Sequence, residues 1–256
     1  MSEPCAQSDT REPIIEFRML GRVPFSNCLK LQNRLMFEAS GQTEPRIVVL
    51  LCEHPNLLTV GRAGSRGHIR RTDQQLAHER IPVRWIARGG GCVLHAPGQL
   101  AVYPVVPLEL VGWSVGGYMR RLQTAIVDTL GALRIRGETR DGSFGVRGRS
   151  GLLAACGVGV KRWVTCHGAY INVNPHMRHY GFIDTDPGAD ASAGERATMG
   201  CLLSERRSGA RMSSVRAALV ESLAAAFGSE HYHLFTGHPW LASQTGTTRE
   251  SSTCKT

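Results

Sequence analysis

Three consecutive glycines, residues 89–91, restrict the fold of this chain more than any other stretch. They follow Arg88 and precede an apolar segment that contains His95. Because glycine has no Cβ, this backbone can adopt positive φ and can press against a ligand. The segment has neither the Gly-Lys-Ser/Thr of a phosphate loop nor the G-x-G-x-x-G of a dinucleotide-binding turn. We therefore expect residues 88–100, which end in a Pro-Gly turn, to form a binding loop.

The rest of the chain mixes strand and helix patterns. Strands are expected at 14–20 (as an edge strand), 46–52, 57–60, 83–86, 100–106, 144–146, 152–160 and 163–173. Apolar residues three and four positions apart predict helices at 24–39, 114–133 and 214–227, and a short helix is expected at 73–79. The sequence has no internal repeat. These patterns predict one α/β (α+β) domain, in which a mixed sheet is flanked by helices.

The two ends of the chain are polar. Residues 1–12 and the tail 239–256 are expected to be disordered, which assigns the folded domain to 13–238. The N-terminus shows no signal-peptide pattern, and no stretch approaches the roughly 20 apolar residues that span a membrane. We therefore expect a cytoplasmic protein that does not bind membranes.

Charge and cysteine content indicate the kind of partner and the cellular compartment of this protein. The net charge of +9 suits an acidic partner, either a nucleic acid or an acidic protein, although scattered basic residues are equally typical of a solvated surface. None of the eight cysteines forms a C-x-x-C pair, so no zinc or redox motif is expected. Several cysteines lie in apolar surroundings and are interpreted as buried thiols in a reducing compartment.

Two further segments are candidates for a site. Small residues interrupt the strand patterns at 153–158 and 164–173, which indicates close approach of a ligand or close packing within a sheet. The acidic segment 184–195 partly matches a calcium loop, but Gly188 and Ala189 stand where that loop needs a carboxylate and a glycine. We interpret it as a solvated acidic loop and expect no metal.

The order of these motifs resembles the lipoyl(octanoyl) transferase family. The family's R-G-G-x-x-T-x-H-G-P-G-Q-L loop is similar to residues 88–100, with Ala96 in place of a glycine. Its A-x-[IL]-G turn and H-G-[LF]-[AS]-[LI]-N-V strand are similar to 153–158 and 167–173. The segment 53–62 resembles its E-H-x-P…T-x-G-R motif. The resemblance covers roughly residues 14 to 228.

The resemblance implies a fold and a reaction. The fold would be that of the biotin/lipoate protein ligases, with 13–238 as an octanoyltransferase-like catalytic domain. Family members take an octanoyl group from octanoyl-acyl carrier protein onto a cysteine, and then pass it to a lysine. The acceptors are lipoyl domains of 2-oxoacid dehydrogenase complexes and the glycine-cleavage carrier protein, and no cofactor, ATP or nucleic acid is needed. Both partners are acidic, so the positive charge of this chain would steer their association.

The resemblance also implies the residues of the acyl pocket. The glycine loop, the small-residue turn and the H-G strand would line it. By position these are Arg88, Gly89, Gly90, Gly91, Cys92, Val93, Leu94, His95, Ala155, Cys156, Gly157, Gly168, Ala169 and Tyr170.

The family's catalytic pair has no match. The lysine that activates the nucleophile falls at Leu152, and the nucleophilic cysteine falls at Asp186. Cys201 is a weak substitute nucleophile, and Cys92 has no evident base. Cys166 neighbours His167, but strand alternation would place the two side chains on opposite faces. The catalytic residues are therefore left unassigned.

Three functions fit this pattern. The first is an octanoyltransferase of lipoate biosynthesis, in which the pocket aligns thioester and lysine for direct transfer. The second is a catalytically inactive homologue that binds an acyl or lipoyl chain or its carrier domain. An ATP-dependent lipoate or biotin ligase is disfavoured, because no adenylate-binding lysine stands on the strand that contains Leu152.

Overall fold

The computed structural model describes residues 12–140, 142–184, 198–206 and 210–246. Its strands are β1 Ile14–Arg22, β2 Arg46–Glu53, β3 Leu57–Val60, β4 Val83–Trp85, β5 Cys92–His95, β6 Gln99–Val105, β7 Gly145–Gly148, β8 Gly151–Lys161, β9 Val164–Asn172 and β10 Tyr232–Thr236. Its α-helices are α1 Phe25–Ala39, α2 Asp73–His78, α3 Val115–Ala132, α4 Leu202–Glu205, α5 Met212–Ala226 and α6 Pro239–Gly246. Two 3₁₀ turns, η1 Arg66–His68 and η2 Met177–Phe182, complete the order.

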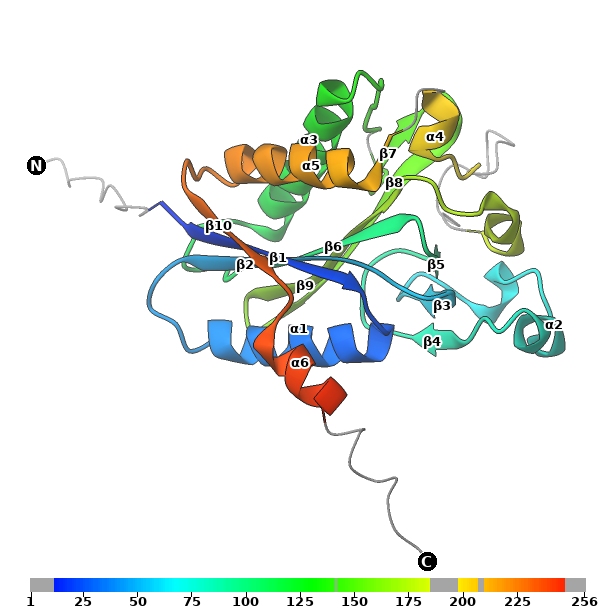
Figure 1. The fold of residues 1–256 in the computed structure, drawn as a ribbon, viewed down its shortest axis with the longest axis horizontal. Helices are drawn as coiled ribbons and strands as arrows, with labels where there is room; N and C mark the ends of the chain where they lie inside the picture. The colour runs from blue at the N-terminus through cyan, green and yellow to red at the C-terminus, as the bar shows by residue number, and fades with distance from the viewer. Residues whose placement is uncertain (1–11, 141, 185–197, 207–209, 247–256) are drawn as a thin grey trace, which may run out of the picture.

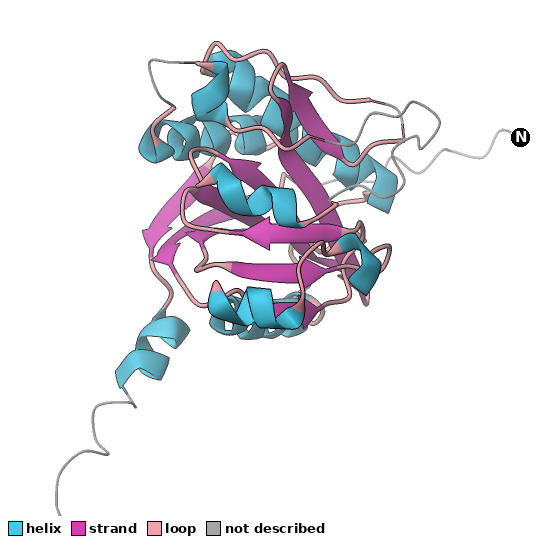
Figure 2. Ribbon diagram, turned by 90° about the vertical axis from the view of Figure 1, so that its right-hand side faces the viewer, coloured by secondary structure: helices cyan, strands magenta, loops and turns pink. Residues whose placement is uncertain are grey.

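Two mixed sheets organise the domain. The large sheet has the order β10-β1-β2-β6-β9-β8-β7, and a smaller one has the order β4-β3-β5. β1 pairs in parallel with β10 and β2, whereas β2-β6-β9-β8-β7 is antiparallel throughout. Helices α3 and α5 cover one face of the large sheet, and α1 and α6 lie on the other (Figures 1 and 2). The expected mixed sheet flanked by helices is confirmed.

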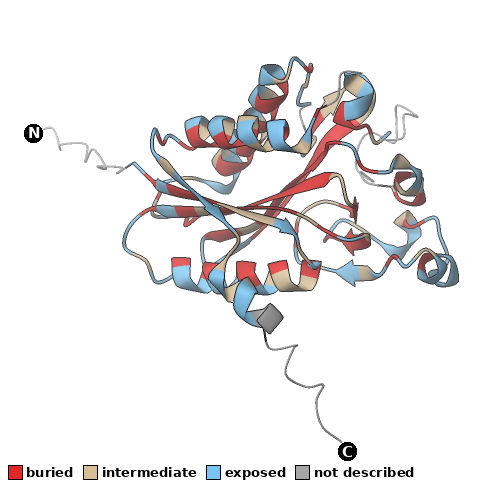
Figure 3. Cartoon of the chain, viewed as in Figure 1, coloured by how far each residue is buried: buried red, intermediate tan, exposed pale blue. Residues whose placement is uncertain are grey.

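The core is divided by the large sheet. On one face, side chains of α3 and α5 such as Leu122 and Leu223 pack against Phe17 and Ile171. On the other, α1 buries its apolar stripe, including Leu31, against β2, β6 and β9. Figure 3 shows buried residues along the strands and on the inner faces of the helices. Ser114 caps α3 by accepting from Gly117 N, which fixes where that helix begins.

Three assignments from the sequence need correction. β1 is not an edge strand, because β10, whose residues 233–236 are exposed and show no buried alternation, pairs along its outer side. Residues 92–95 of the expected loop form strand β5, which pairs with β3. The tail is not disordered from 239 onward, because α6 spans Pro239–Gly246 and Trp240 and Leu241 pack against the core. Residues 1–11 and 247–256 lie outside the described residues.

In the part of the chain that the structure describes, no helix combines the length and apolar character needed to cross a membrane.

Candidate functional site

The glycine loop joins β4 to β5 and docks against β8. Gly89 N donates to Val158 O at 2.8 Å, and Gly90 has φ +77, a conformation that favours glycine. A Cβ added at Gly157 would lie 2.7 Å from Gly89 O. The small residue at 157 therefore reflects close approach of the loop backbone to β8.

Gly168 is small for a different reason. It pairs with Gly157 across β8 and β9, and an added Cβ would lie 2.2 Å from Val102 O in β6. This is close packing within the sheet, the second of the two interpretations left open. Ala169 is fully buried in the core beneath α3 and α5.

Arg88 is buried at the centre of the site, with 1% of its surface exposed. Its Nη2 donates to Thr59 O at 3.0 Å and to Thr59 Oγ1 at 2.9 Å, and its Nη1 donates to Gly89 O at 2.9 Å. Burial lowers the pKa of the Arg88 guanidinium. Within the described residues no carboxylate forms an ion pair with it, so a buried positive charge is held by neutral oxygens alone.

His95 lies beside Arg88 and, like Arg88, contacts the hydroxyl of Thr59. Its Nε2 is 3.0 Å from Thr59 Oγ1, and its ring meets Tyr170 edge-on with centroids 4.7 Å apart. Burial, together with His54 and Arg88, lowers the pKa of His95 well below its usual value. The imidazole is therefore neutral at physiological pH.

Four polar atoms converge here without a well-formed hydrogen bond. They are Arg88 Nε, His95 Nδ1, His167 Nδ1 and Tyr170 Oη. Each belongs to a buried side chain, and burial also lowers the pKa of His167 to about 4. Buried polar atoms in folded proteins are nearly always hydrogen-bonded to protein or to ordered water, so waters or a ligand are expected to complete the bonds of these atoms.

A small cavity of about 50 Å³ opens under the loop. Arg88, Gly90, Gly91 and Val93 line it together with Leu152, Ala155 and Cys156. This volume holds one or two water molecules, because a water occupies about 30 Å³. An eight-carbon acyl chain needs several times more, so the loop or the exposed Phe144 at the rim has to move to admit one.

Alternation in β5 divides the residues predicted for this pocket. Val93 lines the cavity and His95 contacts Thr59 and Tyr170, whereas Cys92 and Leu94 pack into a separate core with Leu58 and Val60. Cys92 Sγ instead lies 3.9 Å from Ser65 O. The prediction treated 92–95 as a loop that exposes every residue to the ligand, and a strand exposes only every second one.

The candidate catalytic positions do not form an activated pair. Leu152 is buried in β8 and lines the cavity, while Asp186 lies outside the described residues. Cys201 Sγ is 3.2 Å from Ser204 Oγ at the start of α4, and it does not line the cavity. Burial raises the pKa of Cys156 to about 12.

The expected separation of Cys166 and His167 is wrong. His167 has φ +57, which breaks the strand alternation, and its backbone N donates to Gln32 Oε1. Cys166 Sγ and His167 Cδ2 lie 2.9 Å and 3.7 Å from the position of a Cβ on Gly159, so both side chains approach the same point. Burial nevertheless raises the pKa of the Cys166 thiol, which disfavours the reactive thiolate.

Sequence reasoning missed the residues that support the site. Thr59 holds both Arg88 and His95, yet a threonine within a β-strand pattern gives no signal of this role. Gln99 Nε2 donates to Leu94 O, Asn172 Oδ1 and Tyr180 Oη, which ties the loop to β9 and η2. These contacts join segments far apart in the chain. Of the calcium-loop template, Asp184 pairs with Arg70, and positions 186–195 lie outside the described residues.

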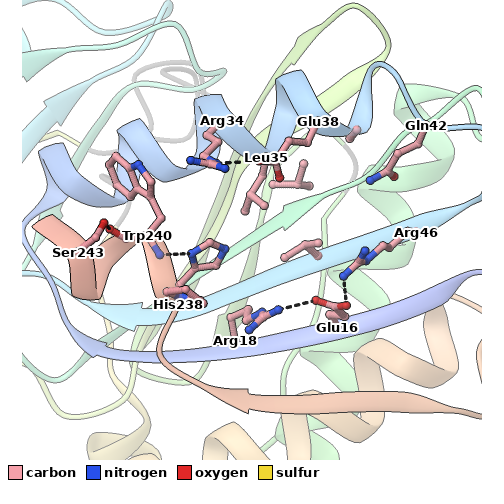
Figure 4. Close-up of a pocket in the computed structure, with 14 residues that line it drawn as sticks. Glu16, Arg18, Arg34, Leu35, Glu38, Gln42, Arg46, His238, Trp240 and Ser243 are labelled. Carbon is pink, nitrogen blue, oxygen red and sulfur yellow. Dashed lines mark hydrogen bonds and ion pairs between the residues drawn. The ribbon is translucent and has the colours of Figure 1, made fainter.

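A second cavity, of about 460 Å³, lies between α1, the first halves of β1 and β2, and α6 (Figure 4). Arg18, Arg34, Arg46 and Trp240 are among the residues that line it. Glu16 pairs with both Arg18 and Arg46. None of the residues predicted to bind substrate lies along this cavity, so it is separate from the site under the glycine loop.

Relatives in sequence agree on one family. The profile of the lipoyl protein ligase A/B catalytic domain matches residues 25–224. The octanoyltransferase of Synechococcus sp. (strain WH7803) is 37% identical over 198 residues, which cover 77% of this chain and 76% of that protein. The octanoyltransferase of Citrifermentans bemidjiense is 36% identical over 168 residues, which cover 66% of this chain and 78% of that protein.

Solved structures agree on the fold. A bi-partite lipoate protein ligase from Thermoplasma acidophilum aligns with a TM-score of 0.69 at 14% identity, covering 94% of each chain. A lipoate-protein ligase A bound with ATP aligns with a TM-score of 0.67 at 16% identity, covering 93% of this chain and 97% of that one. The expected lipoate-ligase-type α/β fold is thus confirmed. By its profile and its relatives, this chain belongs to the lipoyl protein ligase A/B catalytic domain family, among its octanoyltransferases.

Proposed function

We propose that this protein moves an octanoyl group from octanoyl-acyl carrier protein directly to a lysine of a lipoyl domain, without an acyl-enzyme intermediate. Lipoyl domains of 2-oxoacid dehydrogenase complexes and the glycine-cleavage carrier protein are the proposed acceptors. The net charge of +9 favours association with such acidic proteins. The free thiols of the described residues fit a reducing cytoplasm, which is the proposed location.

The observation that carries this proposal is the unpaired charge of Arg88. A buried cation without a counter-charge costs several kcal/mol, so retaining it lowers the stability of the fold. Attack on a thioester turns its carbonyl oxygen into an anion, and a fixed buried cation is suited to stabilise that charge. The Arg88 guanidinium and the neighbouring Tyr170 hydroxyl are the donors that would face it.

Direct transfer also needs a proton acceptor, and His95 is the proposed one. The Thr59 hydroxyl can donate to Val93 O while it accepts from Arg88 and from Nε2–H of His95. This arrangement leaves Nδ1 of His95 with a lone pair. The lysine nitrogen attacks the carbonyl carbon, the C–N bond forms and the C–S bond breaks. His95 takes the amine proton and returns it to the departing thiolate.

The thiols near the site support a route without covalent catalysis. A nucleophilic cysteine needs a depressed pKa, which a nearby cation provides. Burial instead raises the pKa of Cys156, Cys166 and Cys92. Leu152 places an apolar side chain where the family resemblance implies a lysine.

The test follows the mass of an apo lipoyl domain incubated with this protein and one of two donors. The donors are octanoyl-acyl carrier protein and free octanoate with ATP. With octanoyl-acyl carrier protein we expect the acceptor to gain one octanoyl group on its lysine, because the site stabilises attack on a thioester. A lysine-to-arginine acceptor should stay unmodified. Modification that requires free octanoate and ATP would instead identify a ligase.

A second candidate function is binding without transfer. The apolar Leu152 favours it, because this side chain lines the cavity where it can contact an acyl chain but cannot take part in acid-base chemistry. Its signature is stable binding of octanoyl-acyl carrier protein with an acceptor mass that does not change at any enzyme concentration. That result would contradict the transferase proposal.

A further inference from the structure

Three potential metal ligands meet behind the site, and the proposed transfer uses none of them. Cys28 comes from α1, Cys52 from β2, and His54 follows the end of β2. Cys28 Sγ lies 3.9 Å from Cys52 Sγ, and Cys52 Sγ lies 3.6 Å from His54 Nε2. All three ligand atoms lie within 4.8 Å of one another, and all three residues are buried.

These separations match those of ligands around one thiophilic ion. Zinc binds thiolate sulfur at about 2.3 Å and imidazole nitrogen at about 2.0 Å. In a tetrahedral site two such sulfurs lie roughly 3.8 Å apart, and a sulfur and a nitrogen roughly 3.5 Å apart. The observed 3.9 Å and 3.6 Å therefore need only small movements of two side chains.

The tautomer of His54 suits a metal ligand. Its Nδ1 lies 2.8 Å from Val23 O, and a carbonyl oxygen only accepts, so Nδ1 carries the hydrogen. The single lone pair of Nε2 then accepts from the Tyr103 hydroxyl at 2.8 Å and also faces Cys52, so a bound ion would require that hydroxyl to turn away from Nε2. Metal-binding histidines commonly donate their other ring N–H to a backbone carbonyl in this way. Burial lowers the pKa of His54 to about 4, which keeps the ring neutral.

Tyr103 and Gln32 border the cluster, and the charges of its three ligands would balance that of a divalent ion. Tyr103 Oη is 2.8 Å from His54 Nε2, and Gln32 Nε2 is 3.8 Å from Cys28 Sγ. Two thiolates and a neutral imidazole cancel the charge of a divalent ion, so the filled site adds no net charge to the core. Without an ion, burial and the neighbouring Cys28 raise the pKa of Cys52 well above its usual value.

We propose that Cys28, Cys52 and His54 form a structural site for a thiophilic metal ion, with Zn²⁺ as the charge-balanced occupant. Binding converts two thiols into thiolates and releases two protons, so affinity falls at low pH. The spacing of these residues, 24 and 2 positions apart, matches no zinc motif, and only the packing of α1 on β2 brings them together.

The ion would connect this cluster to the back of the proposed site. His54 contacts the ring of His95 with centroids 5.7 Å apart and that of Phe25 at 5.3 Å. A metal bond at Nε2 would fix His54 against both rings and tie α1 to β2. Its role would be to hold the wall of the site in place and to raise the stability of the fold.

The test loads the reduced, metal-free protein with Zn²⁺ or Co²⁺ and removes excess ion by gel filtration. We expect about one ion per chain, a higher thermal midpoint, and the thiolate-to-cobalt absorption of a tetrahedral sulfur site. Cys28→Ala and Cys52→Ala should each lose the ion and the absorption. Cys166→Ala, which removes a partly buried thiol outside the cluster, should retain both.

Wild-type protein that retains no ion and gives no cobalt absorption would overturn the proposal, whatever the variants do. Equal metal content in Cys28→Ala and wild type would overturn it too, because the ion would then sit elsewhere. Circular dichroism decides whether a variant is folded, and Cys52→Val replaces Cys52→Ala if the smaller side chain leaves the core unstable. These readouts do not depend on octanoyl transfer.

Discussion

Replacing Arg88 with methionine should reduce the kcat of octanoyl transfer by about 10²- to 10³-fold, with a much smaller change in KM. Methionine preserves most of the side-chain volume but removes the charge that would stabilise the oxyanion, and loss of one such donor has this effect in other acyl transfers. The fold should survive, because removing an unpaired buried charge offsets the hydrogen bonds lost to Thr59 and Gly89. Initial rates of acceptor octanoylation measure the effect.

Arg121→Met is the matched control. Arg121 is exposed on α3, where it contacts Trp113 and donates to Ala226 O, far from the glycine loop in sequence and in its contacts. It should leave kcat unchanged. If Arg88→Met is folded and its kcat stays within about tenfold of wild type, Arg88 does not stabilise the transition state and the assigned role is wrong.

Gly157→Ala should reduce both stability and activity. Its Cβ would lie 2.7 Å from Gly89 O and 3.3 Å from Arg88 Cδ, so either the loop or the strand has to shift. Overpacking of this kind costs about 1–3 kcal/mol. A shift of the loop by about 1 Å misplaces the groups around the thioester and lowers the rate by about 10²-fold. Urea unfolding and the octanoylation assay measure the two effects.

Gly131→Ala is a control that should change the unfolding free energy in the opposite direction. Gly131 lies in the last turn of α3, and a Cβ there meets nothing within 4 Å. Alanine should raise the unfolding free energy by up to about 1 kcal/mol, because glycine is a poor helix former. Wild-type activity in Gly157→Ala would show that the approach of the loop to β8 does not matter for catalysis.

Most helices and strands could be predicted from local sequence patterns. The regular spacing of apolar residues marked α1, α3 and α5, and continuous apolar runs marked β2 and β6. β5 was missed because the neighbouring glycines dominate the local signal, although Cys92–His95 is fully buried. β10 was missed because it is short and mostly exposed, so only pairing with β1 defines it.

The candidate site was only partly accessible from sequence. The Arg88 loop was predicted from its glycines, and that prediction depends on local conformation. The support from Thr59, the approach of Gly157 and the free nitrogen of His167 depend on contacts between distant segments. The positive φ of His167 is likewise set by its surroundings, since its backbone N is held by Gln32 from α1.

The most direct test of direct transfer is the intact mass of this protein, quenched in acid during turnover with octanoyl-acyl carrier protein and a lipoyl domain. We expect the acceptor to gain octanoyl while the protein itself stays unmodified at every time point. An octanoyl adduct on the protein that forms and decays at the turnover rate, is released by hydroxylamine, and maps to a cysteine such as Cys201 or Cys166 would contradict it.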